Sequence, residues 1–178
     1  MKLLAREIRI IMMEYQELSV DEKILFQMAT DVRLKAQAPY SHFQVGVAVM
    51  SISGKIHVGC NVERASWTQT THAEQNAIDT MVACEGSAKL FKLALVGGMT
   101  DMKVVVPPKR NISYELKFDE VPVPCGHCLQ IIWENCHNDG AVELLSLCSN
   151  GLIAKVTIEN AFPLKFGPKD LGVEYKKQ

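Results

Sequence analysis

The sequence predicts a three-layer α/β/α domain built on a mixed five-stranded sheet. Segments with helix caps or helical periodicity alternate with short apolar segments that have the length of strands. Two of these strands are separated by a Ser53-Gly54 turn and predict a hairpin. The order helix, hairpin, helix, strand, helix, strand, strand is typical of a mixed sheet covered by helices on both faces. A chain of 178 residues is long enough for one such domain with a sizeable core.

The N-terminal part of the chain predicts two helices. Apolar residues Leu4, Ile8 and Ile11 recur at helical spacing, so residues 1–18 are predicted to form an N-terminal helical extension. Ser19 and Glu22 have the spacing of a capping box and predict the start of a second helix, which ends near residue 36. We expect the remaining residues, 19–178, to form a single catalytic domain.

The central and C-terminal elements follow from the same patterns. Strands are predicted at residues 44–52, 55–62, 90–96, 141–147 and 152–158. One helix is predicted from Thr71 or His72 to near Gly86, and another at residues 126–135. The segment 99–123 contains Pro107-Pro108 and predicts a long irregular connection with room for a short hairpin. Long connections of this kind are often functional or lie at interfaces.

Composition and charge narrow the functional classes. The net charge is −1, and there is no long basic run, so we expect no polynucleotide partner. No stretch of about 18 apolar residues is present to cross a membrane. Charged residues interrupt the N-terminal segment, which argues against a signal peptide, and a cytoplasmic location is predicted. Four cysteines show no paired spacing and are predicted to be buried small hydrophobic residues: Cys60, Cys84, Cys136 and Cys148.

The most informative motif is His72-Ala73-Glu74 followed by Pro124-Cys125-Gly126-His127-Cys128. Two thiols and one imidazole are preferred zinc ligands, and three protein ligands leave the fourth position of a tetrahedron to water. Cys125 and Cys128 are three residues apart, so both sulfurs can face one point at the start of a helix. Glu74 is not needed as a ligand and is placed to move protons. This spacing matches the signature of zinc-dependent nucleobase deaminases.

Other interpretations of the Cys-x-x-Cys pair remain to be weighed. An isolated pair is often a structural zinc clip or a redox centre, but a structural zinc normally has four protein ligands. His127 lies between the two cysteines and is expected to point away from their shared face. A redox pair has no need of the distant His72 and Glu74. A zinc protein without catalysis would have no use for the Glu74 carboxylate.

Beyond the zinc motif, the chain resembles cytidine deaminases over about residues 21–171. Five segments, two of which contain the halves of the zinc motif, carry the resemblance in the same order as in that family. They are Ala38-Pro39-Tyr40-Ser41-His42-Phe43-Gln44-Val45-Gly46, Gly59-Cys60-Asn61-Val62-Glu63, the stretch from Thr71 to Ile78, the stretch from Pro124 to Gln130, and the tail from Phe162 to Leu171. The resemblance implies a zinc-dependent hydrolase of pyrimidine salvage that converts cytidine and deoxycytidine to the uridine forms and ammonia.

The resemblance also implies roles for individual residues. Glu74 would be the catalytic proton carrier, with His72, Cys125 and Cys128 holding Zn²⁺. Asn61 and Glu63 match the pair that binds the ribose hydroxyls, and their i, i+2 spacing in a strand places them on one face. The other matching positions are Phe43, which lines the nucleoside pocket, Ala73, whose N–H meets the pyrimidine carbonyl, and Trp67 and Phe166 at a pocket shared between subunits.

Two departures from the family pattern leave the substrate and the assembly open. Leu129 replaces the usual arginine after the second cysteine; with a histidine ligand the zinc site is formally neutral, so the arginine is less needed. Segment 99–123 holds an insertion of about twenty residues. Both departures motivate an alternative substrate, a modified cytidine or a nucleoside antibiotic; a polynucleotide-editing deaminase is less favoured. A shared pocket through Phe166 predicts a homotetramer, with a homodimer as the alternative.

Overall fold

The computed structural model describes residues 1–175, and the last three residues of the predicted domain 19–178 lie outside them. One sheet organises these residues, with strand order β1-β6-β5-β4-β2-β3. Its strands are β1 (Ile11–Met13), β2 (Phe43–Ser51), β3 (Ile56–Cys60), β4 (Leu90–Met99), β5 (Glu143–Leu147) and β6 (Ile153–Thr157). The β4–β5 pair is parallel and the other pairs are antiparallel, which confirms a mixed sheet.

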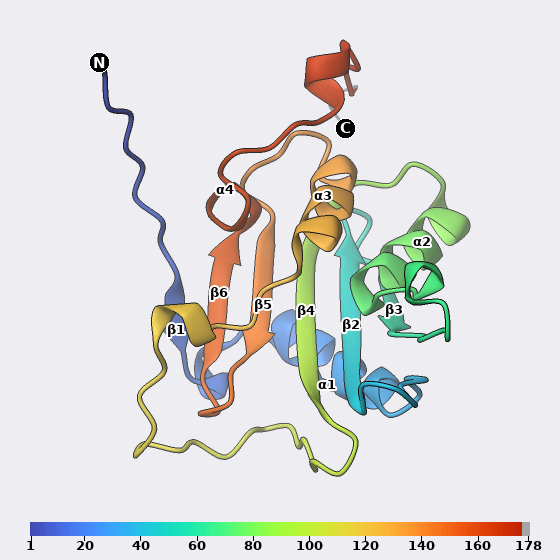
Figure 1. The fold of residues 1–178 in the computed structure, drawn as a ribbon, viewed down its shortest axis with the longest axis vertical. Coiled ribbons are helices and arrows are strands. Elements are labelled where there is room, and N and C mark those ends of the chain that lie inside the picture. Colours follow the sequence, from blue (N-terminus) through green and yellow to red (C-terminus); the bar gives the residue numbers. More distant parts are fainter. Residues whose placement is uncertain (176–178) are drawn as a thin grey trace.

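Helices cover both faces of the sheet, as Figure 1 shows. Helix α1 (Val20–Arg33) lies on one face, and α2 (Ala73–Glu85), α3 (Gly126–Asn135) and the short α4 (Ile158–Ala161) lie on the other. Each face has its own apolar core because neighbouring residues of a strand point to opposite sides. On β2, Val47 and Val49 join the core under α2 and α3, whereas Ala48 and Met50 join the core under α1.

The predicted N-terminal helix is wrong, and the sheet has six strands rather than five for the same reason. Residues 1–10 have no regular secondary structure, and Ile11–Met13 form β1. This strand pairs with the edge of β6, with Ile11 opposite Lys155 and Met13 opposite Ile153. A short isolated helix is marginal in water, so the hydrogen bonds offered by an open sheet edge outweigh a weak helical periodicity.

The other elements lie close to their predicted positions. Ser19 caps α1 and forms the predicted capping box with Glu22. Helix α3 spans the predicted residues, and α2 begins after His72 and ends before Gly86, whose φ of 73° stops the helix. In the described residues no strand lies between Met99 and Glu143, so the 99–123 segment forms no hairpin and holds only a short 3₁₀ helix, Phe118–Glu120.

Two glycines allow helices to approach the sheet closely. A Cβ atom on Gly59 of β3 would lie 2.2 Å from the backbone nitrogen of Ala77 in α2. A Cβ atom on Gly46 of β2 would lie 2.0 Å from the carbonyl oxygen of Ala29 in α1. Both helices therefore rest on strand backbone, and this contact fixes the position of α2, whose first residues belong to the motif identified in the sequence.

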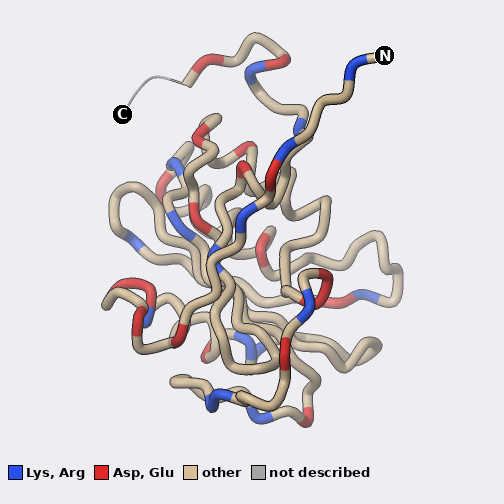
Figure 2. The backbone as a smooth tube through the Cα atoms, turned by 90° about the vertical axis from the view of Figure 1, so that its left-hand side faces the viewer, with Lys and Arg blue, Asp and Glu red and all other residues tan. Residues whose placement is uncertain are grey.

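Basic and acidic residues are interspersed over the backbone, as Figure 2 shows. Within residues 1–175, no helix has the length and apolar character needed to span a membrane. Of the four cysteines predicted to be buried, Cys60, Cys136 and Cys148 are buried, but Cys84 is exposed near the C-terminal end of α2, where it faces solvent.

Candidate zinc-dependent active site

Two helix N-termini meet at the predicted metal site. His72 is the N-cap residue of α2 and Cys125 is the N-cap residue of α3. Neither uses its side chain to cap its own helix, so both side chains are available for another partner. Cys128 follows in the first turn of α3 and is fully buried. The N-terminal ends of α2 and α3 therefore meet at these three side chains.

The three predicted ligands converge. Nδ1 of His72 lies 3.4 Å from Sγ of Cys125 and 3.4 Å from Sγ of Cys128. The donor atoms of all three residues lie within 4.8 Å of one another. His127 is exposed and stays outside this group, although its ring centroid is 5.7 Å from that of His72. The group thus offers three ligands, the number typical of catalytic zinc sites.

The donor set fits zinc in its chemistry as well as in its number. Burial raises the pKa of the Cys128 thiol, and the neighbouring charges of Glu74 and Cys125 raise it further. A divalent cation offsets this effect because zinc binds the thiolate form. With two thiolates and one neutral imidazole the bound zinc would be formally neutral, which suits a site without a basic neighbour in either motif.

Glu74 and Ala73 occupy the first turn of α2, directly after the His72 cap. Glu74 is only 6% exposed, yet it lines a cavity of about 540 Å³ together with His72 and Cys125. Ala73 also lines this cavity. Its backbone N–H belongs to the first turn of α2, where such groups have no partner within the helix. The site therefore combines a metal-binding group, a buried carboxylate and a helix N-terminus on one wall.

The lining of the same cavity includes residues predicted to bind the nucleoside. Phe43, Asn61, Glu63 and Trp67 all line it. Asn61 also bonds to β2: its Oδ1 accepts from the Val45 N–H at 2.8 Å and its Nδ2 donates to the Phe43 carbonyl at 2.9 Å. The sequence motif alone gave no indication of these structural bonds.

Glu63 is 3% exposed and holds the loop that precedes β2. Its Oε2 atom accepts hydrogen bonds from the backbone N–H groups of Tyr40 and Ser41, at 3.0 and 3.2 Å. Burial acts to raise the pKa of Glu63, but the hydrogen bonds from Ser41 and Tyr40 outweigh it and the pKa is lowered. The carboxylate is therefore an anionic acceptor at neutral pH.

Phe166 is placed elsewhere. It is 58% exposed and is not among the described residues that line the cavity, and its carbonyl accepts a hydrogen bond from Gln130 Nε2 at 3.1 Å.

Several residues that line the cavity were not identified from the sequence. Val45 could have been found because it follows Phe43 by two positions and shares its face of β2. The others are Ser41, Thr70, Leu95, Gly97, Pro122, Val123 and Leu147.

Leu129, in the position after the second cysteine, points into the protein. It is 8% exposed and belongs to the apolar core beneath α2 and α3, together with Ile132 and Trp133. A leucine here packs against its apolar neighbours and contributes no charge to the metal site.

The fold is a mixed sheet covered by helices, and two helix N-termini together present two cysteines, one histidine and a buried glutamate. These features define the class of zinc-dependent deaminases. Residues 19–140 match the model of the family described as the cytidine and deoxycytidylate deaminase zinc-binding region. The chain belongs to this family of zinc-binding hydrolases.

Individual relatives agree with this assignment. A cytidine deaminase from Halalkalibacterium halodurans is 32% identical over 152 residues, which cover 85% of this chain and 98% of the relative. One from Sporosarcina psychrophila is 31% identical over 152 residues, covering 85% and 96%. Among solved structures, the cytidine deaminase from Mycobacterium tuberculosis aligns with a TM-score of 0.60 at 27% identity, covering 84% of this chain and 99% of that one.

Proposed function

We propose that this protein hydrolyses cytidine and deoxycytidine to uridine and deoxyuridine, with release of ammonia, as part of pyrimidine salvage. The observation that carries the proposal is the shared cavity. It is lined by Glu74 and by His72 and Cys125, which converge with Cys128. Two polar side chains suited to a ribose, Asn61 and Glu63, line the same cavity.

In the proposed mechanism His72, Cys125 and Cys128 hold zinc. When bound, zinc supplies a water molecule whose pKa is lowered to about 7. Glu74 would take one proton from this water and deliver it to ring nitrogen N3 of the pyrimidine, while the oxygen of the water adds to C4. Glu74 then carries the second proton of the water to the amino group, which leaves as ammonia as the C4 carbonyl forms.

The remaining residues orient the substrate. The N–H of Ala73 donates to the pyrimidine carbonyl, and Asn61 and Glu63 bind the ribose hydroxyls. Phe43 and Trp67 provide apolar walls for the base and sugar. Buried polar groups left without partners are costly, so a ribose clamp of this kind selects nucleosides over free bases.

We further propose that a homotetramer completes the site, with a homodimer as the alternative. Trp67 and Phe166 support this because they are 61% and 58% exposed, although both are large aromatic residues. A neighbouring subunit would cover Trp67 at the cavity, and Phe166, which lies away from the cavity of its own subunit, would reach the cavity of the neighbour. We also propose that residues 19–178 act as one catalytic domain with residues 1–18 as an extension, and that the protein acts in the cytoplasm on small molecules and not on nucleic acid.

A modified cytidine or a nucleoside antibiotic is the second candidate substrate. Two observations favour it: Pro122 and Val123 of the 99–123 segment line the cavity, and Leu129 replaces the family arginine.

The test is the loss of ultraviolet absorbance when zinc-loaded protein is mixed with cytidine, with Glu74→Gln as the comparison. We expect turnover by the wild type and a decrease in kcat of about 10²-fold or more in the variant, at equal zinc content. Deamination of free cytosine faster than cytidine would contradict the nucleoside assignment. No turnover of cytidine by fully metallated protein would favour the modified substrate.

A further inference from the structure

A second hollow of about 430 Å³, which we call the annex, adjoins the substrate cavity. The two share four lining residues: Phe43, Gly97, Pro122 and Leu147. Phe43 forms the partition between them. A Cβ atom on Gly97 would lie 3.0 and 3.1 Å from the Phe43 ring, so this ring rests directly on the backbone of β4. The annex therefore lies directly beside the substrate cavity, with this ring between them.

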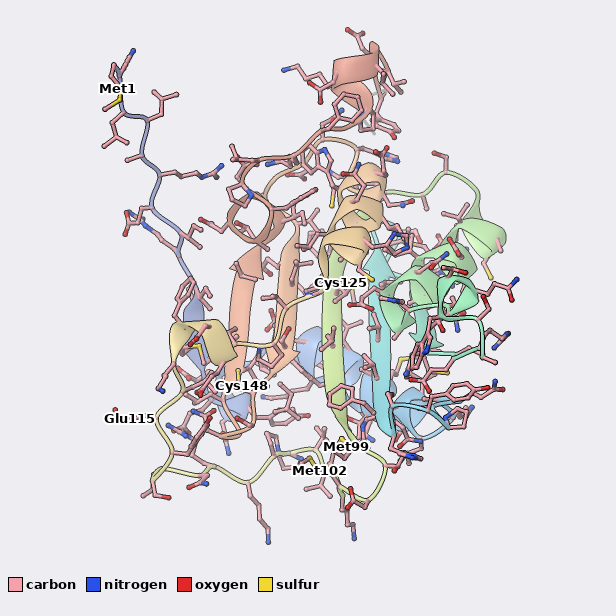
Figure 3. All side chains as sticks on the ribbon, in the orientation of Figure 1. Met1, Met99, Met102, Glu115, Cys125 and Cys148 are labelled. Carbon is pink, nitrogen blue, oxygen red and sulfur yellow. The ribbon has the colours of Figure 1, made fainter. Side chains whose placement is uncertain are left out.

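The annex lies at the end of the cavity away from the metal-binding group. On β4, Leu95 lines only the substrate cavity, Gly97 lines both hollows, and Met99 lines only the annex. The strand rises about 3.4 Å per residue, so these positions follow one another away from His72 and Cys125. Figure 3 shows Met99 and Met102 at the lower end of β4, well below Cys125, with Cys148 to one side.

The lining of the annex is apolar and comes largely from the 99–123 segment. Met99, Met102, Val104, Val105 and Pro108 contribute to it. Among the described residues, no Asp or Glu lines it, and its two charged lining residues are Lys103 and Lys109, both exposed. Met102 is 55% exposed and Val105 is 39% exposed. Apolar side chains that face a hollow beside a catalytic cavity are suited to an apolar part of the substrate.

Hydrogen bonds that involve backbone carbonyl groups hold the segment that lines the annex in place at both ends. The buried guanidinium of Arg33 donates to the carbonyls of Met99 at 2.7 Å and Met102 at 3.5 Å. Further along the segment, the Asn111 N–H donates to the Asn150 carbonyl at 2.9 Å, and so does Arg110 Nη1 at 3.1 Å. The segment is thereby fixed to α1 at one end and to the β5–β6 turn at the other.

We infer that the annex receives an apolar substituent attached to the sugar of the nucleoside. This inference rests on the proposed function, because the reacting amino group must lie at the metal site. The opposite end of the nucleoside, its sugar, then lies nearest to Met99. The preferred substrate class is a cytidine whose 5′ position carries a short apolar group, and the 99–123 segment determines this preference.

The test compares cytidine with 5′-deoxy-5′-(butylthio)cytidine, whose thioether resists hydrolysis. We expect kcat/KM for the butylthio compound to exceed that for cytidine by about tenfold or more. In Met102→Trp, whose larger side chain fills the annex, we expect this ratio to return to about one or below. Ile112→Trp is the matched control in the same segment, at an 85% exposed position outside the annex, and it should keep the wild-type ratio.

Binding separates this inference from the proposed reaction. In Glu74→Gln protein, calorimetry measures the affinity for both nucleosides without turnover, and we expect the butylthio compound to bind more tightly. Cytidine turnover with equal or weaker binding of the butylthio compound would overturn the annex assignment while leaving the deaminase intact. The annex assignment would also be overturned if the protein preferred cytidine 5′-phosphate to both nucleosides and lost this preference in Lys103→Ala or Lys109→Ala. That result would show that the annex receives an anionic group.

Discussion

The carboxylate of Glu63 accepts a hydrogen bond from the backbone N–H of Tyr40 at 3.0 Å, and this bond joins the predicted ribose clamp to the loop that precedes β2. The same oxygen accepts from Ser41. One residue therefore shapes the wall of the cavity and offers a charge to the ligand, so changes at Glu63 affect folding and binding together.

Glu63→Ala is expected to lower the free energy of unfolding and to raise KM for cytidine. The backbone N–H groups of Tyr40 and Ser41 lose a charged acceptor, which costs about 1–3 kcal/mol. Glu63→Gln retains an acceptor oxygen and should recover most of the stability while KM stays high. Urea denaturation combined with cytidine kinetics checks both effects. If Glu63→Ala had the same free energy of unfolding as wild type, the stabilising role of the Glu63 carboxylate would be contradicted.

Replacement of a predicted ligand is expected to remove zinc. His72→Ala, Cys125→Ser and Cys128→Ser should each reduce bound zinc well below one per chain, because two remaining ligands hold the metal poorly. Elemental analysis after dialysis measures this. Cys84→Ser is the matched control at an exposed cysteine and should keep its zinc. A chelator should likewise lower the melting temperature of wild type more than that of Cys128→Ser.

Leu129→Arg is expected to destabilise the protein without increasing kcat. Leu129 is part of the core with Ile132 and Trp133, so a charged side chain there must be desolvated or force α3 to shift. The cost should be about 2 kcal/mol or more. Thermal unfolding and cytidine kinetics test this. If Leu129→Arg were as stable as wild type and had a higher kcat, the expectation would be contradicted. The metal site would then benefit from a positive charge that wild type does not provide.

Acid should destabilise the protein through Glu22. This residue is 3% exposed, and Lys92 and Lys155 each donate to its Oε1 at 2.8 Å. Burial acts to raise the pKa of Glu22, but the hydrogen bonds from Lys155 and Lys92 outweigh it and lower the pKa to about 2.

Because the folded-state pKa lies below the ordinary value of 4.5, the stabilisation is present above that value and is lost as the pH falls toward 2. Its size is roughly 3 kcal/mol. We therefore expect Glu22→Gln to be less stable than wild type at pH 7 and the difference to shrink below pH 4, measured by urea unfolding. Asp21→Asn, an exposed neighbour in the same helix, should show no comparable loss. A difference that stays constant with pH would exclude the ion pairs as its source.

The metal, its three ligand residues and most of the secondary structure could be predicted from the sequence alone. The spacing of His72, Glu74, Cys125 and Cys128 follows local rules: helix starts, capping and the i, i+3 geometry of two cysteines. Such rules depend on nearby residues, so they can be recognised without knowing the fold. The capping box of Ser19 and Glu22 is another local signal that the structure contains.

The conformation of residues 1–18 and the shape of the cavity depend on contacts between elements that lie far apart in the sequence. The N-terminal strand depends on a free edge at β6, far away in the sequence, and its helical spacing carried no information about that edge. In the same way, Leu147 lines the same cavity as Phe43 because β4 pairs with β2 on one side and with β5 on the other. Contacts of this kind arise from packing between elements, which residue spacing along one segment does not encode.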